Sequence, residues 1–121
     1  MGYRSDVAYV IKFEDMDSLN AFKTCTLFED KAMRDALADC ETVEEDCLIR
    51  FHAESVKWYP GYEEVQAHER LIKSACDEPF KAGARVVRIG ENDDDIETDD
   101  FGEMDWEPWD HIEVIRAVNF I

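Results

Sequence analysis

The sequence predicts an α+β fold, a two-layer sandwich with helices on one face of a mixed four-stranded sheet. Strand-like and helical patterns follow one another in the order β-α-(α)-β-α-β-β, so two helical crossovers precede a closing pair of strands. The 121 residues fit one domain, 1–121, and a 45% share of hydrophobic residues is enough to build its core. A ferredoxin-like arrangement is not expected, because the predicted order has no hairpin in its middle.

The first part of the chain is predicted to hold one strand and two helices. Apolar residues occupy both phases of the alternation over 7–13, which is typical of a central strand. Asp15, Asp17 or Ser18 is placed to cap a helix with an apolar stripe over 19–26. A second, shorter helix is expected over 30–38.

The middle of the chain is predicted to hold a strand, a turn and the longest helix. Apolar and polar residues alternate over 47–58, and the phase of this alternation changes near Ser55, which predicts a β-bulge or a strong bend. Pro60 and Gly61 then form a turn. The stripe of apolar residues over 62–76 has helical spacing, and His68 belongs to it, so we interpret His68 as a core or boundary residue.

The last part of the chain is predicted to hold two strands, over 84–89 and 112–120, joined by a long acidic connection. The 20 residues from Glu91 to Asp110 include eleven acidic residues and no basic one, so they carry −11 of the formal net charge of −17. Aromatic residues interrupt this charge run, which is unlike a purely solvated tail. We therefore interpret 91–110 as an acidic connection that aromatic side chains anchor.

Composition narrows the classes of partner and compartment. With 30 acidic and 13 basic residues, the chain is not expected to bind nucleic acid directly or to lie on an anionic membrane. No apolar run approaches the roughly 20 residues of a membrane span. The short apolar run near the N-terminus lacks the basic lead of a secretory signal, and the four cysteines lack zinc-site spacing. We therefore expect reduced thiols, mostly buried, in a cytoplasmic protein.

The acidic connection supplies the candidate binding residues. Dense carboxylates steer a protein toward cationic sites, and aromatic residues anchor interfaces, so we expect this segment to recognise a basic surface on another protein. A nucleic-acid mimic or inhibitor, bound to a protein that normally holds nucleic acid, is the most specific form of this hypothesis. The assigned residues are Asp93, Asp94, Asp95, Glu97, Asp99, Asp100, Trp106 and Trp109. Trp58 and Tyr59, beside the Pro60 turn, are further aromatic residues that fit either a core edge or a binding anchor.

An intramolecular role for the acidic connection is a first alternative. Most basic residues outside the helices fall on predicted strands, so the connection could fold over the protein's own sheet. These residues are Lys12, Arg50, Lys57, Arg85, Arg88 and Arg116. The sequence leaves both this choice and the oligomeric state open.

A metal-binding module using the Asp93–Asp100 cluster is a second alternative, since hard cations prefer several carboxylates. An EF-hand is excluded because the glycine at the sixth loop position is missing and Met104 stands at the twelfth. Crowding in the acidic segment is also expected to raise carboxyl pKa values, which would make the fold more stable at mildly acidic pH than at pH 7.

A small enzyme is a third alternative, with an unrecognised site on the sheet face around Arg50, His52, Arg88 and Arg116. The chain has no nucleophile–base pair at suitable spacing, no phosphate-binding loop and no zinc motif. We therefore predict a non-enzymatic protein and assign no catalytic residue, no metal ligand and no cofactor.

Three stretches of the chain carry a resemblance to a protein family. They are MGYRSDV at the start, KWYPGYEEVQ over 57–66 and VRIGENDDDIE over 87–97. The chain resembles small acidic proteins encoded by tailed bacteriophages and prophages, a largely uncharacterised family. The resemblance implies a viral or prophage origin and a bacterial host cytoplasm, and it supplies no functional residues.

Overall fold

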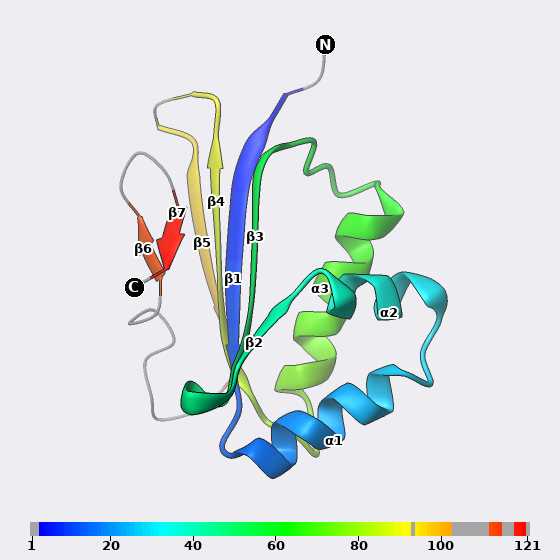
Figure 1. Ribbon diagram of the computed structural model, residues 1–121. Helices are drawn as coiled ribbons and strands as arrows, with labels where there is room; N and C mark the ends of the chain where they lie inside the picture. Colours follow the sequence, from blue (N-terminus) through cyan, green and yellow to red (C-terminus); the bar gives the residue numbers. More distant parts are fainter. Residues whose placement is uncertain (1–2, 93, 103–111, 115–117, 121) are drawn as a thin grey trace.

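The fold has helices on one side of a sheet and a small hairpin on the other side, as the nearly edge-on view of Figure 1 shows. The computed structural model describes residues 3–92, 94–102, 112–114 and 118–120. In chain order the elements are β1 (Ser5–Lys12), α1 (Met16–Thr26), α2 (Lys31–Ala38), β2 (Glu41–Val43), the 3-10 helix η1 (Glu44–Asp46), β3 (Leu48–Val56), α3 (Glu63–Cys76), β4 (Gly83–Gly90), β5 (Ile96–Phe101), β6 (Ile112–Val114) and β7 (Val118–Phe120). The predicted α+β class is therefore confirmed.

The main sheet has five strands in the order β2-β3-β1-β4-β5, and every neighbouring pair is antiparallel. The prediction of a mixed four-stranded sheet is wrong. Two strands were missed, the short β2 and also β5, which lies inside the predicted acidic connection. The strand expected over 112–120 is wrong as well, because β6 and β7 pair with each other in a separate hairpin beside β1 and β4.

From β1 to β4 the elements follow in the order β-α-α-β-β-α-β, which gives the strand topology of a ferredoxin-like sheet with two helices in the first crossover. Its middle hairpin joins β2 and β3 through η1 and a left-handed Cys47 (φ 55°). The expectation that this arrangement is absent is therefore wrong. With three residues, β2 is too short to show an alternation in the sequence. The fifth strand, β5, is an addition at the far edge of β4.

Both faces of the central strand β1 are buried, as its continuous apolar run predicts. Val7, Tyr9 and Ile11 pack into the larger core between the sheet and the helices. Ala8 and Val10 lie on the opposite face, in a smaller core with residues of β3 and β4. All five side chains are 0% exposed. β1 therefore holds the two cores together.

The helices begin and end close to the predicted positions. The Asp15 carboxylate caps α1 by accepting a hydrogen bond from the backbone N–H of Ser18 at 2.8 Å. Asp30 caps α2 in the same way, through the N–H of Met33 at 2.9 Å. In α3 the predicted stripe is buried, and its members are Val65, His68, Leu71, Ile72 and Ala75. No described helix combines the length and apolar character that crossing a membrane requires.

The predicted bulge in β3 is confirmed at Ser55. Ala53 pairs with Val7 and Val56 pairs with Ser5, so two residues of β3 stand opposite one residue of β1. Ser55 has a left-handed backbone (φ 54°), and its N–H donates to the Asp6 carboxylate at 2.8 Å. The extra residue shifts the alternation, so the residues beyond it, Val56 and Trp58, turn toward the helices.

Replacement of Leu71 by alanine tests the packing of α3. Leu71 is fully buried, so Leu71→Ala should lower the free energy of unfolding by about 2–5 kcal/mol. Glu69→Ala on the exposed side of the same helix is the matched control, and it should change stability by less than about 0.5 kcal/mol. Urea denaturation of both variants gives the comparison, and equal small losses would contradict the packing described.

Candidate functional site

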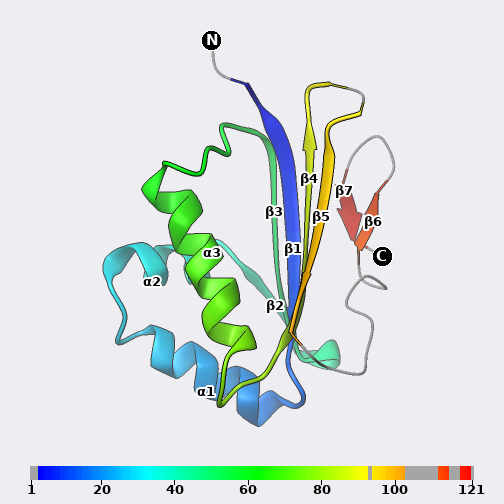
Figure 2. The same ribbon diagram turned by 180° about the vertical axis from the view of Figure 1, so that it is seen from behind.

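The residues that line a groove come mainly from α3 and from the edge of the sheet formed by β4 and β5. Figure 2 shows where these elements lie on the helix-bearing side of the sheet. The groove has a volume of about 740 Å³, which lies in the usual range for binding pockets. The walls and floor come from four parts of the chain. They are Tyr3 and Ser5; Trp58, Tyr59 and Pro60; Val65, Glu69, Ile72 and Lys73 of α3; and Val86, Arg88, Asp95, Glu97, Asp99 and Phe101 of the β4–β5 hairpin.

The middle of the groove is apolar. Val65 and Ile72 of α3 are almost fully buried, and Val86 on β4 packs against the same core. Phe101 on β5 is 44% exposed, so a large aromatic face is available to solvent at the edge of the sheet. Trp58 lies at the groove because the bulge in β3 turns it to this side. Trp58, Val86 and Phe101, which are not fully buried, offer a surface for the apolar part of a ligand.

The arginine of the groove is already paired within the protein. Arg88 Nη2 lies 2.8 Å from Asp95 Oδ1 and 3.0 Å from Glu97 Oε1, and Arg88 Nη1 donates to Ser5 Oγ at 2.9 Å. Hydrogen bonds to Glu97 and Asp95 raise the Arg88 pKa. The bond from Arg88, with a second from Tyr3 Oη at 2.6 Å, lowers the pKa of Asp95. At Asp95 the sign is therefore opposite to the expectation from carboxylate crowding.

The remaining charges of the groove leave an excess of negative charge. Lys73 Nζ lies 3.4 Å from an Asp77 carboxylate oxygen, so this cation also has an internal partner. Within the described part of the chain, neither Glu69 nor Asp99 takes part in an ion pair. Glu69 belongs to the helix wall and Asp99 to β5. The groove therefore presents two unpaired carboxylates beside an apolar floor.

The structure brings together part of the predicted binding set. Asp95, Glu97 and Asp99 line the groove, whereas Asp94 is exposed in the turn before β5. Asp100 lies on the opposite face of the sheet, where Arg85 Nε approaches its Oδ1 at 3.0 Å. Asp93, Trp106 and Trp109 lie outside the described residues. Glu69 was missed, because nothing in the sequence pattern links an exposed helix position to a strand 30 residues later.

The structure bears in different ways on the three alternatives from the sequence, which are an intramolecular role, an enzyme site and a metal site. Part of the acidic segment, β5, lies beside β4 as the edge strand of the sheet rather than over a sheet face, and Arg85 and Arg88 of β4 form ion pairs with it. The residues predicted to form an enzyme site do not share one face of the sheet. Arg88 lies on the helix side, whereas Arg50 and His52 pair with β1 residues of the opposite face. Arg116 lies outside the described residues. Among described residues, no three His, Cys, Asp or Glu side chains are grouped for a metal ion.

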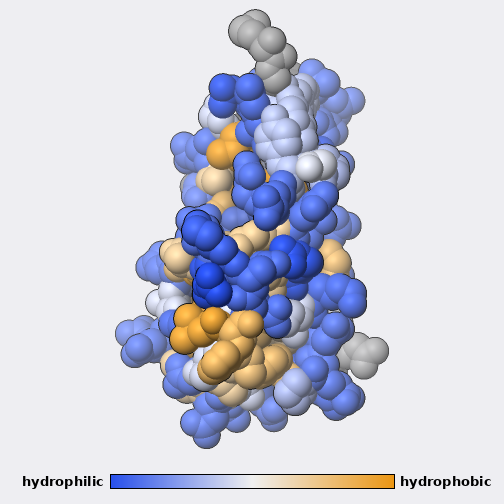
Figure 3. Space-filling model, turned by 90° about the vertical axis from the view of Figure 1, so that its right-hand side faces the viewer, coloured by the Kyte–Doolittle hydropathy of each residue, from blue (hydrophilic) through white to orange (hydrophobic). Residues whose placement is uncertain are grey.

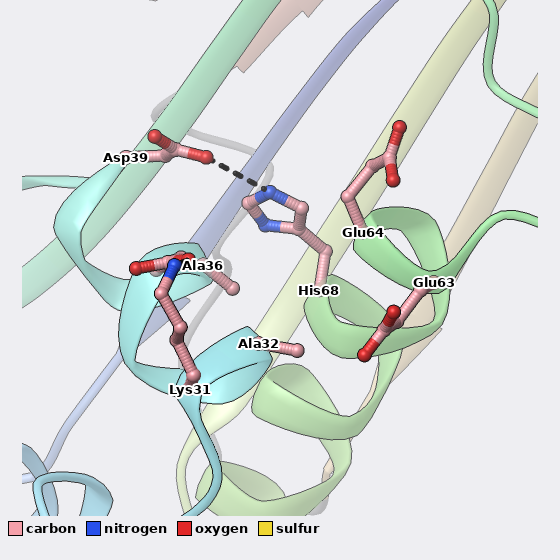
Figure 4. A pocket seen from close by; sticks show the side chains of 8 residues that line it. Lys31, Ala32, Ala36, Asp39, Glu63, Glu64 and His68 are labelled. Atoms are coloured by element: carbon pink, nitrogen blue, oxygen red, sulfur yellow. Dashed lines mark hydrogen bonds and ion pairs between the residues drawn. The ribbon is translucent and has the colours of Figure 1, made fainter.

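A second, smaller pocket of about 260 Å³ lies between α2 and the start of α3, with His68 at its centre (Figure 4). Tyr9 Oη lies 2.6 Å from His68 Nδ1, and Asp39 Oδ2 lies 3.5 Å from Nε2. Burial lowers the His68 pKa, and Asp39 opposes this effect. A neutral ring therefore directs Nε2–H toward Asp39 and accepts a hydrogen bond from the Tyr9 hydroxyl at Nδ1. His68 thus joins α2, α3 and β1.

The cysteines offer little nucleophilic chemistry. All four are free thiols, as expected, but Cys25 is exposed and the other three are half-buried, so the expectation that most are buried is wrong. Burial raises the pKa of Cys40 and of Cys76 to about 11, which keeps both protonated at neutral pH.

The helix-bearing side is mostly hydrophilic, with an apolar patch low on this face (Figure 3). Among the side chains that the structure describes, the most exposed large apolar ones are in the turn between α1 and α2, where Leu27 is 61% and Phe28 87% exposed. Comparisons with protein-family models, curated proteins and solved structures find no match. Function is therefore inferred from the chemistry of the groove itself.

The buried His68 leads to a prediction on pH dependence. Its pKa in the folded state is below 6.5, so on acidification the unfolded chain takes up a proton first. The stability that the neutral ring provides should therefore be complete above about pH 6.5 and should fall as the pH drops toward the folded-state pKa. This trend opposes the earlier expectation of greater stability in mild acid.

Urea denaturation between pH 7 and pH 5 measures the effect. His68→Gln removes the titrating ring, so its free energy of unfolding should decrease less over this range than that of the parent protein. Parallel pH profiles for the two proteins would contradict the role given to His68.

Proposed function

We propose that this protein is a non-enzymatic interaction protein that binds a basic segment of another protein in the groove between α3 and β5. One observation carries the proposal. The cations of the groove, Arg88 and Lys73, have partners within the protein, while Glu69 and Asp99 have none among the described residues. A lysine or arginine side chain from a partner would supply the missing charge on both walls.

The apolar floor supports the same proposal. Partner segments that bind tightly usually combine charged contacts with an aromatic or aliphatic anchor. Phe101 is exposed at the edge of the groove and Ile72 lies at its wall, so an apolar side chain can pack there. A cation near the Trp58 ring would also gain from the negative face of that ring.

The overall charge supports recognition at a distance. A formal net charge of −17 creates a field that attracts basic surfaces and speeds their association at low salt. The internal pairs of Arg85 and Arg88 remove part of the acidic segment from this role. The groove thus makes the direct contacts with the partner. The other carboxylates contribute mainly by attracting the partner electrostatically from a distance.

A more specific form of the proposal makes the partner a nucleic-acid-binding protein in the cytoplasm of a bacterial host, with this chain of phage or prophage origin acting as an inhibitor. The formal net charge of −17 supports this form. Competition distinguishes it, because DNA and this protein should then displace each other from the partner. Simultaneous binding of both would contradict the inhibitor form and leave the groove proposal intact.

Neutralising the groove tests the proposed function. Partners are captured from bacterial lysate on the immobilised protein at low and high salt, identified by mass and purified for titration. Glu69→Gln combined with Asp99→Asn removes the two unpaired carboxylates. Two partly exposed ion pairs are worth together about 1–2 kcal/mol, so binding should weaken by about fivefold to thirtyfold.

The control removes the same charge elsewhere. Glu44→Gln combined with Glu45→Gln neutralises two exposed carboxylates of η1 and should slow association only slightly. Equal losses in the two double variants would show that bulk charge, rather than the groove, binds the partner.

A further inference from the structure

The outer edge of β5 is a second recognition element beside the groove. β5 ends the sheet, with β4 on one side and, within the described part of the chain, no strand on the other. All six of its residues are exposed. We propose, on the basis of the proposed function, that the basic segment binds as an added antiparallel strand along β5, so that backbone hydrogen bonds join the groove contacts.

The charge of β5 selects the occupant. The strand carries Glu97, Asp99 and Asp100 and no basic residue. Two copies of this chain paired along β5 would place carboxylates opposite or next to one another, which destabilises a sheet. A basic strand reverses the sign of the same contacts. The opposite edge of the sheet is the shorter β2, with three residues, so β5 offers the longer template.

The alternation of β5 gives the partner a pattern. Glu97, Asp99 and Phe101 line the groove, whereas Asp100 faces the other side of the sheet with Arg85. Directly opposite residues of neighbouring strands share a face. An antiparallel partner strand therefore presents an apolar residue beside Phe101, then a basic residue beside the unpaired Asp99, two positions apart. A second basic residue two positions further lies beside Glu97, where it shares that carboxylate with Arg88 and adds less.

Antiparallel addition is the orientation that the sheet itself uses. Every neighbouring pair in the main sheet is antiparallel, and antiparallel pairing is slightly more stable per residue than parallel pairing. Specificity then comes from spacing as well as from charge. A segment with the same composition but adjacent basic residues would turn one of them away from the groove.

Synthetic peptides test this pattern on the full chain. The probe is Thr-Val-Thr-Arg-Thr-Lys-Thr with both ends blocked, and the control is Thr-Val-Thr-Thr-Arg-Lys-Thr, which has the same composition and charge. Calorimetric titration should show that the probe binds about threefold to fivefold more tightly, since the control loses one partly exposed ion pair from the groove. Equal affinity of the two peptides would overturn the proposed pattern.

Methylation of single backbone nitrogens in the probe tests the strand pairing directly, because it removes one N–H donor at a time. In an antiparallel pair, alternate residues direct their N–H toward the neighbouring strand. Methylation should therefore abolish binding at every second position and be tolerated at the positions between. If methylation is tolerated at every position, strand addition is overturned. The proposed function would still stand if the variant Glu69→Gln with Asp99→Asn loses the captured partner.

A pair of variants places the contact on β5. Asp99→Asn should weaken binding of the probe by about threefold to fivefold, the value of one partly exposed ion pair. Asp94→Asn removes the same charge from the turn outside β5 and should have little effect on binding of the probe. Equal effects of the two variants would overturn the assignment to β5. The probe could also fail to bind while binding of the captured partner still depends on Glu69 and Asp99. This result would overturn strand addition and leave the proposed function intact.

Discussion

Burial of both faces of β1 is the constraint on which the rest of the structure depends. A strand with apolar residues in both phases is stable only when material covers it on both sides and neighbouring strands satisfy its backbone. The helices cover the side of Tyr9, and the β6–β7 hairpin lies beside β1 on the other. A groove lined by residues of α3, β4 and β5 lies on the helix side of the sheet.

Internal charge pairing decides which carboxylates are available to a partner. β5 is acidic and its neighbour β4 carries Arg85 and Arg88, so strand pairing brings opposite charges together on both faces of the sheet. These pairs stabilise the position of β5 and use up part of its charge. Asp99 lies between Glu97 and Asp100, the two β5 residues that form these pairs. Asp99 and Glu69 of α3 both line the groove, so the unpaired negative charge is concentrated there.

The candidate site could be predicted only in part. Asp95, Glu97 and Asp99 were assigned because the density of acidic residues between 91 and 110 is visible in the sequence. The helix wall of the groove was not predicted, because Glu69 is one of many exposed acidic residues. Glu69 gains its role only when α3 packs beside β5. The grouping of Arg88 with Arg50 was wrong for the same reason, because strand register decides which face each residue takes.

Local features of the fold were determined by the sequence itself. The cap of α1, the stripe of α3 and the bulge at Ser55 depend on residues a few positions apart. The sequence predicted the stripe and the bulge, and Asp15 was one of its three candidates for the cap of α1. The tertiary structure alone decided the strand partners, and hence β2, β5 and the ferredoxin-like order. A strand of three residues, or an exposed acidic one, has little intrinsic preference for its form. Such strands exist because hydrogen bonds and ion pairs with distant neighbours stabilise them, and the pattern of a single segment does not contain those neighbours.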